Sequence, residues 1–150
     1  MIFRSPYGDV AVPKIPFHEF VLGRAEQREN ALAFIDPDAQ RRVTFGELVR
    51  DARRIAAGLA QRGMRKGDVF AVMLPNVPEF ATAFFGVLAA GGIVTTLNPL
   101  YTSDEIAHQL KDSGAKYLLT IPPCFERASA AANSAGIREL FVVGDHAPIC

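Results

Sequence analysis

The chain has 150 residues, 49% of them hydrophobic and 21% charged, and its formal net charge is zero. This length and apolar content suit one globular domain that buries roughly two-thirds of the surface of the unfolded chain. A neutral chain gives no electrostatic reason to expect a nucleic-acid partner or an acidic membrane as a partner.

The first part of the chain predicts an irregular segment followed by short elements. Residues 1–16 are rich in proline and predict no regular structure, and residues 18–27 are compatible with a short helix. Two β-prone runs, 31–36 and 41–45, flank an Asp-Pro-Asp turn sequence. We therefore expect a β-hairpin over these two runs.

The clearest helix of the sequence begins at Phe45 and ends near Gly63. Its apolar residues recur at spacings of three and four, namely at Phe45, Leu48, Val49, Ala52, Ile55, Ala56 and Leu59. Thr44 and Glu47 have the spacing of a capping box at the helix start. Gly63 suits the left-handed residue that commonly follows a helix.

Basic residues are concentrated between positions 41 and 66. This stretch contains Arg41, Arg42, Arg50, Arg53, Arg54, Arg62, Arg65 and Lys66. Only Glu47 and Asp51 oppose them. The stretch is either an anion-binding face or a solvated helix face. We favour the solvated face, because aromatic residues other than Phe45 are not interleaved for base stacking.

A β-strand followed by a helix repeats through the rest of the chain. The strand-like runs begin at spacings of 24, 24 and 23 residues, at Val69, Ile93, Tyr117 and Leu140. The intervening helical segments are 78–90, 103–113 and 125–135. Strand, helix and strand at this pitch predict right-handed βαβ crossovers, and hence an α/β fold with a layered, mostly parallel sheet.

Two of these helices begin with capping-box sequences, Asn76 with Glu79 and Thr102 with Glu105. The segment 78–90 is apolar on nearly every side, so we expect it to be buried in a fold of at least three layers. The stretch 80–103 is uncharged and long enough for a membrane span. The Gly-Gly that interrupts it favours a buried helix and strand, with a membrane hairpin as a remote alternative.

The sequence contains no complete motif for phosphate or dinucleotide binding. Gly86 and Gly91 have the spacing of P-loop glycines, but no Lys-Ser/Thr pair follows them. They also lie at the end of a helix, where the helix dipole repels anions. No GxGxxG occurs anywhere, so a small Rossmann-type enzyme is disfavoured.

Histidines and cysteines do not form a catalytic or metal-ligand pattern. His108 lies opposite Ile106 on its helix, so a solvent-facing position is expected. His18 and His146 have no ligand residues near them in sequence. Cys124 precedes a helix but has no adjacent base, which favours an unreactive thiol. Cys124 and Cys150 show no CxxC spacing, so we expect a reducing, cytoplasmic compartment.

The stretch 98–102, Asn-Pro-Leu-Tyr-Thr, follows a predicted strand at the position where parallel sheets bind ligands. Asn98 and Pro99 stop the strand, since proline has no amide donor and restricts the residue before it. Thr102 then caps the next helix. These structural roles are sufficient, and we favour them over ligand binding.

Two longer stretches carry a family resemblance. KGDVFAVMLPNVPEF (66–80) followed by GGIVTTLNPLYTSDEIAHQL (91–110) resembles the N-terminal part of adenylate-forming acyl- and aryl-CoA ligases, with the 4-coumarate–CoA ligase type most similar. The resemblance extends over nearly the whole chain from about Pro16. It implies residues 1–16 as an irregular segment and 17–150 as the first α/β part of a larger N-terminal adenylation domain.

The resemblance also implies chemistry. Such a ligase activates a carboxylic acid with ATP, usually with Mg²⁺, to give an acyl-adenylate and pyrophosphate. The thiol of coenzyme A then displaces AMP to form a thioester. The family residues for these steps lie in a Ser/Thr/Gly-rich loop ending in Pro-Lys-Gly, in later nucleotide-binding motifs and in a mobile C-terminal domain. This sequence contains none of them.

Catalytic, cofactor-binding and metal-binding residues are therefore all expected to be absent from this chain. We expect a leading, inactive piece of the enzyme that binds no cofactor alone and whose partners are the downstream domains of the same enzyme. Apolar surface left uncovered predicts self-association of the piece. A stand-alone, non-enzymatic α/β binding module is the alternative. The sequence does not identify the acid that is activated.

Overall fold

A four-stranded parallel sheet forms the centre of the structure, a computed structural model that describes residues 6–8 and 11–144. Its strands are β3 (Val69–Val72), β4 (Ile93–Thr96), β5 (Ala115–Thr120) and β6 (Glu139–Val142). They lie in the order β4-β3-β5-β6, and every neighbouring pair is parallel. The predicted parallel sheet of repeated βα units is confirmed.

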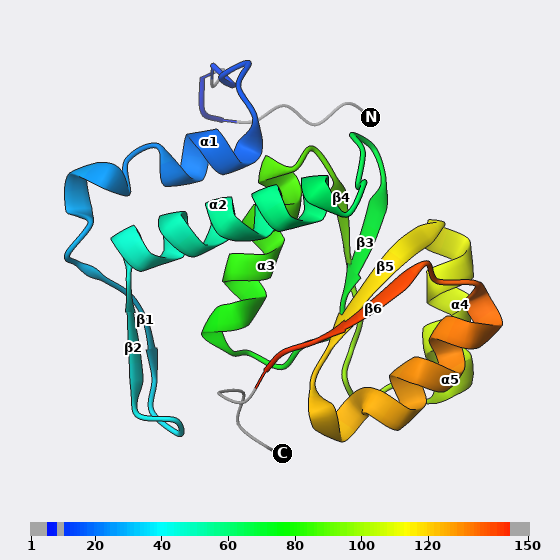
Figure 1. The fold of residues 1–150 in the computed structure, drawn as a ribbon. Coiled ribbons are helices and arrows are strands. Elements are labelled where there is room, and N and C mark those ends of the chain that lie inside the picture. Colours follow the sequence, from blue (N-terminus) through cyan, green and yellow to red (C-terminus); the bar gives the residue numbers. More distant parts are fainter. Residues whose placement is uncertain (1–5, 9–10, 145–150) are drawn as a thin grey trace.

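Helices cover both faces of this sheet, which gives the three layers expected from the sequence (Figure 1). On one side α2 (Phe45–Gln61) packs on α3 (Pro78–Ala89), and on the other side α4 (Ser103–Ser113) packs on α5 (Phe125–Ala135). The Thr44–Glu47 capping box starts α2, and Gly63 follows its end with a φ of 83°. Both features were predicted.

The N-terminal part adds a hairpin and a short helix beside α2 (Figure 1). Strands β1 (Leu32–Asp36) and β2 (Arg41–Thr44) form the predicted antiparallel hairpin. The helix expected over residues 18–27 is shorter than predicted. It runs as α1 (Phe17–Leu22), and a separate turn of 3-10 helix, Glu26–Arg28, follows it. Gly23, a poor helix former, follows the last residue of α1.

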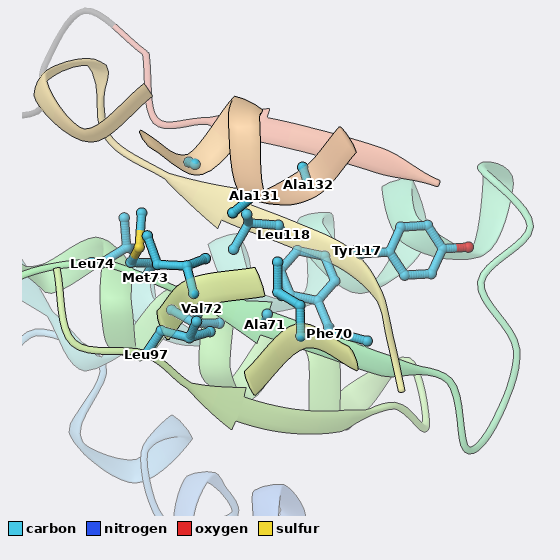
Figure 2. Close-up of a cluster of buried hydrophobic side chains, with 14 of the residues drawn as sticks. Phe70, Ala71, Val72, Met73, Leu74, Leu97, Tyr117, Leu118, Ala131 and Ala132 are labelled. Atoms are coloured by element: carbon cyan, nitrogen blue, oxygen red, sulfur yellow. The ribbon is translucent and has the colours of Figure 1, made fainter. Parts of the chain in front are cut away.

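The core lies between β3, β5 and α5 (Figure 2). Strand β3 is covered on both faces, which explains its continuous apolar sequence from Phe70 to Leu74. The ring of Phe70 stacks on that of Tyr117 with centroids 5.8 Å apart. Alanines at positions 128, 131 and 132 are buried and have small side chains, which lets α5 pack close to the sheet.

Helix α3 is only partly buried by the elements of the described chain, so part of its all-round apolar surface stays uncovered. Its buried residues are Pro78, Ala83, Gly86 and Val87. The aromatic rings on its other side are partly exposed and contact Phe17 of α1, which is itself 58% exposed. The sheet covers one side of α3 and helix α2 another, so the remaining side stays accessible in the described chain.

Candidate functional site

The order of the strands indicates where a ligand site is most expected. The chain passes from β3 to β4 at one side of the sheet and then crosses to β5 on the other side of β3. The strand order therefore reverses between β3 and β5. In open doubly wound sheets, ligands bind beyond the carboxyl ends of the strands at such a point. The loops that follow β3, β4 and β5 are thus the candidate site.

The β3–α3 loop differs from the sequence prediction. The expected capping box of Asn76 with Glu79 is wrong, because the residue that precedes the helix is Val77, which makes no side-chain cap. Pro78 occupies the first helical position, where its missing amide costs nothing. This places Asn76 outside the helix. Glu79 instead forms an ion pair with Arg41 of β2, 38 residues earlier in the chain.

A hollow of about 300 Å³ lies between this loop and the hairpin, but its charge is wrong for phosphate. Asp36 and Asp38 line it beside Asn76 and Phe80. The Oδ1 atom of Asp36 accepts hydrogen bonds from two amides of its own turn, at 3.1 Å each. Carboxylates at this position offset the attraction that the start of α3 exerts on anions.

The β4–α4 loop, residues 98–102, is ordered by its own side chains. The Leu100 amide donates to Asn98 Oδ1 at 2.9 Å, which closes a turn at Pro99. Thr102 and Glu105 form the predicted capping box at the start of α4. The amide and hydroxyl of Thr102 donate to Glu105, and these hydrogen bonds lower the pKa of that carboxyl. The cap predicted for Thr102 is confirmed, whereas β4 already ends at Thr96, so Asn98 closes a turn beyond the strand and is not the residue that stops it.

Arg127 of α5 also holds this loop, and the sequence analysis missed it. Its guanidinium donates to the carbonyl oxygen of Tyr101 at 2.8 Å and to that of Pro99 at 3.0 Å. Cys124 lies beside this contact, with its sulfur 3.8 Å from the Pro99 oxygen. The thiol is free and buried, 4% exposed, which agrees with the unreactive thiol expected there. No periodicity or motif in the sequence predicts the contact between Arg127 and this loop.

Amide donors are scarce where β5 ends. Thr120 is fully buried, and its hydroxyl has no hydrogen-bond partner among the described residues. Pro122 and Pro123 follow it, and neither can donate a backbone hydrogen bond. Pro75 and Pro78 have the same effect in the facing β3–α3 loop. A phosphate cradle is built from convergent backbone amides, so these loops are poorly suited to hold a nucleotide.

Lys116 forms an ion pair that joins the starts of two neighbouring strands. It belongs to β5, and its ammonium donates to Asp68 Oδ1 at 2.7 Å. The other carboxylate oxygen of Asp68 accepts from the Arg65 amide at 2.9 Å. The bond from Lys116, followed by the bond from Arg65, lowers the pKa of Asp68. The pair lies at the amino ends of β3 and β5, opposite to the candidate site, and its role is structural.

The other candidate side chains remain apart from one another. His108 is exposed on α4, as predicted, and His18 lines a hollow between α1 and α2. His146 and Cys150 lie outside the described residues. Across residues 6–8 and 11–144, no group of three His, Cys, Asp or Glu side chains is arranged to hold a metal ion. No helix in the same part of the chain is long and apolar enough to cross a membrane.

The basic stretch forms ion pairs with nearby acidic residues. Arg50 and Arg54 are exposed on α2 and both pair with Asp51. Arg62, just after α2, pairs with Glu139 of β6. These pairings neutralise part of the charge and agree with the solvated helix face that the sequence predicted.

Comparison with known proteins identifies the family of the chain, which the geometry of these loops does not. The sequence family described as AMP-binding enzyme matches residues 22–148. The chain is 38% identical over 130 residues to 4-coumarate--CoA ligase-like 1 of Arabidopsis thaliana, covering 86% of this chain and 24% of that protein. It is 37% identical over 133 residues to 4-coumarate--CoA ligase 5 of Oryza sativa subsp. japonica, with coverages of 88% and 25%.

Solved structures show the same arrangement of elements. A benzoate CoA ligase from Burkholderia xenovorans LB400 matches with a TM-score of 0.81 at 27% identity, over 90% of this chain and 27% of that one. A long-chain-fatty-acid-CoA ligase from Archaeoglobus fulgidus matches with a TM-score of 0.85 at 23% identity, over 95% and 30%. The second likeness concerns the fold alone. The chain spans about a quarter of the length of the curated relatives it matches.

Proposed function

The chain belongs to the AMP-binding enzyme family, and from this premise we propose that it contributes the first α/β part of the adenylation domain of an ATP-dependent acyl- or aryl-CoA ligase. The whole enzyme joins a carboxylic acid to ATP, forming an acyl-adenylate with release of pyrophosphate. The thiol of coenzyme A then attacks the acyl carbon and releases AMP. The observation that carries the proposal is the 38% identity to a 4-coumarate–CoA ligase-like protein over 86% of this chain.

We place the chemistry itself outside these 150 residues. ATP and Mg²⁺ need convergent amides, cations and carboxylates around the phosphates. Prolines follow β5, and the hollow between the β3–α3 loop and the hairpin is lined by two aspartates but by no lysine or arginine. The residues present therefore do not fit the nucleotide, and no step of the reaction is assigned to them. Their role in the proposal is to frame the domain and to position sequence that follows.

Two further properties belong to this proposal. We place the enzyme in the reducing cytosol, in keeping with the free thiol of Cys124. We also propose that the chain self-associates when it is isolated, because Phe17 and Phe20 of α1 are 58% and 55% exposed. Sedimentation velocity tests the second point. A single monomeric species over a wide concentration range, with no binding of a hydrophobic dye, contradicts it.

The experiment is a segment exchange into a relative. The matching quarter of the rice ligase is replaced by this chain, and exchange of labelled pyrophosphate into ATP is measured with cinnamic-type and fatty acids. The matched control is a protein built with the same junctions that carries the rice ligase's own segment. We expect acid-dependent exchange from the chimera. A chimera that is folded, as judged by a cooperative melt, and yet inactive with every acid overturns the proposal.

The isolated chain gives the complementary measurement. We expect no pyrophosphate exchange and no shift of its melting temperature with ATP and Mg²⁺. Exchange activity that follows the chain through purification would show that the chemistry lies within these residues. A saturable shift with ATP but no exchange would favour a stand-alone binding module.

A further inference from the structure

The contact between Arg127 and the β4–α4 loop joins segments that are 26 to 28 residues apart in the chain. Two different nitrogens of one guanidinium reach two carbonyl oxygens of the loop, at 2.8 Å for Tyr101 and 3.0 Å for Pro99. Both bonds are partly buried and charge-assisted. Such bonds are shorter and stronger than those between neutral groups. The fork of the guanidinium also fixes the spacing between the two carbonyls.

The loop is held at both ends by local bonds, and Tyr101 also packs against the hydrophobic core. The Asn98 turn fixes the first residues and the Thr102 cap fixes the last. Leu100 lies between them and is 83% exposed, so burial of its side chain does not hold the backbone in place. The carbonyls bound by Arg127 lie on either side of Leu100. The guanidinium therefore adds two bonds on either side of an exposed residue, in addition to the Asn98 turn, the packing of Tyr101 and the Thr102 cap.

We infer that Arg127 is a positioning residue, which holds the 98–102 loop in one conformation at the carboxyl edge of the sheet. As a result, the backbone of the 98–102 loop keeps one position beside the end of β4, with the side chain of Leu100 exposed to solvent. The inference concerns the order of the loop and is independent of the proposed ligase chemistry. It predicts that loss of the guanidinium loosens this loop without loosening the sheet beneath it.

Hydrogen exchange measured by mass spectrometry tests this inference on the chain itself. The amides of Leu100, Tyr101 and Thr102 are all hydrogen-bonded, to Asn98 Oδ1, Asn98 O and Glu105 Oε2, so their exchange is slowed in the ordered loop. In Arg127→Met, which keeps the apolar stem, we expect exchange of these amides to be about tenfold faster. The amides of β5 should exchange as in the unaltered chain.

Two further variants make the result specific. Arg127→Lys keeps the charge but not the fork, so one carbonyl at most is held and the acceleration should be intermediate. Arg54→Met is the matched control, since Arg54 is exposed and pairs with Asp51 of its own helix. It should leave loop exchange unchanged. Loop exchange that stays unchanged in Arg127→Met overturns the inference. An equal acceleration in the loop and in β5 also overturns it, because that pattern reports general destabilisation.

Discussion

Replacing Gly86 with alanine tests how closely helices α2 and α3 approach each other. An alanine Cβ at this position would lie 2.6 Å from Ile55 Cγ2, 2.7 Å from Ile55 Cβ and 3.1 Å from the carbonyl oxygen of Ala52. Ile55 belongs to α2; its Cβ moves only with the backbone, and β-branching restricts the rotation that would move its Cγ2. The two helices must therefore move apart to admit one methyl group.

Two opposing terms set the magnitude of the effect. Alanine is favoured over glycine inside a helix by about 1 kcal/mol. Overpacking a close contact costs about 1–3 kcal/mol, and this overlap with a Cβ atom belongs at the upper end of that range. The net change is a loss of about 2 kcal/mol in the free energy of unfolding. For a chain of this size it lowers the melting temperature by about 4–8 °C.

Gly58→Ala provides the matched control. Gly58 lies inside α2, and no atom lies within 4 Å of the position its Cβ would take. There the helix preference acts alone, so we expect a gain of about 1 kcal/mol in the free energy of unfolding. Thermal melts give the melting temperature of both variants, and urea titrations analysed with one common m-value give their free energies of unfolding. A Gly86→Ala protein as stable as Gly58→Ala would refute the close packing of the two helices.

The remaining predictions concern caps and charge. Thr102→Ala should lower the free energy of unfolding by about 1 kcal/mol, whereas Asn76→Ala should leave the melting temperature unchanged, because only the first residue caps a helix. Equal losses in urea titrations of the two variants would contradict this assignment. Asp68 has a lowered pKa, so its stabilising effect is present above the unfolded pKa and is lost as the pH falls through the folded pKa. Asp68→Asn should therefore flatten the acid side of the stability–pH curve, and an unchanged acid limb in melts between pH 6 and pH 2 would show that the Lys116 contact is not formed.

The elements of this fold were predictable because local sequence signals agree with the tertiary structure. The amphipathic period of α2 is the same period that faces its neighbours, and Thr44 and Thr102 cap the helices that they were expected to cap. The spacings of 24, 24 and 23 residues between strand starts are long enough for a helix between each pair of strands, and the apolar period of each connection indicated one. Parallel pairing follows from those connections, since a crossover helix returns the chain in the same direction.

Some failures of prediction have local causes, such as Gly23 after α1 and Pro78 at the start of α3, and others concern partners that are distant in the chain. The sequence signal at Asn76 was genuine, but Pro78 fixed the start of α3 one residue later than a cap at Asn76 requires. Glu79 then paired with Arg41, and Lys116 with Asp68, 48 residues away. Such choices depend on which side chains the fold brings within reach. A periodicity of 2 or 3.6 residues carries no information about them.

The loop 98–102 shows how a family can be identified from residues that have structural roles. Asn98 closes a turn after β4, Pro99 presents its carbonyl to Arg127, and Thr102 caps α4. Each of these requirements comes from the connection between β4 and α4, which any member sharing this fold must make. A signature of this kind reports the framework and does not identify a substrate. The reaction must be read from residues that contact the nucleotide and the acyl group, and the prolines at the carboxyl edge of this sheet leave little room for such contacts.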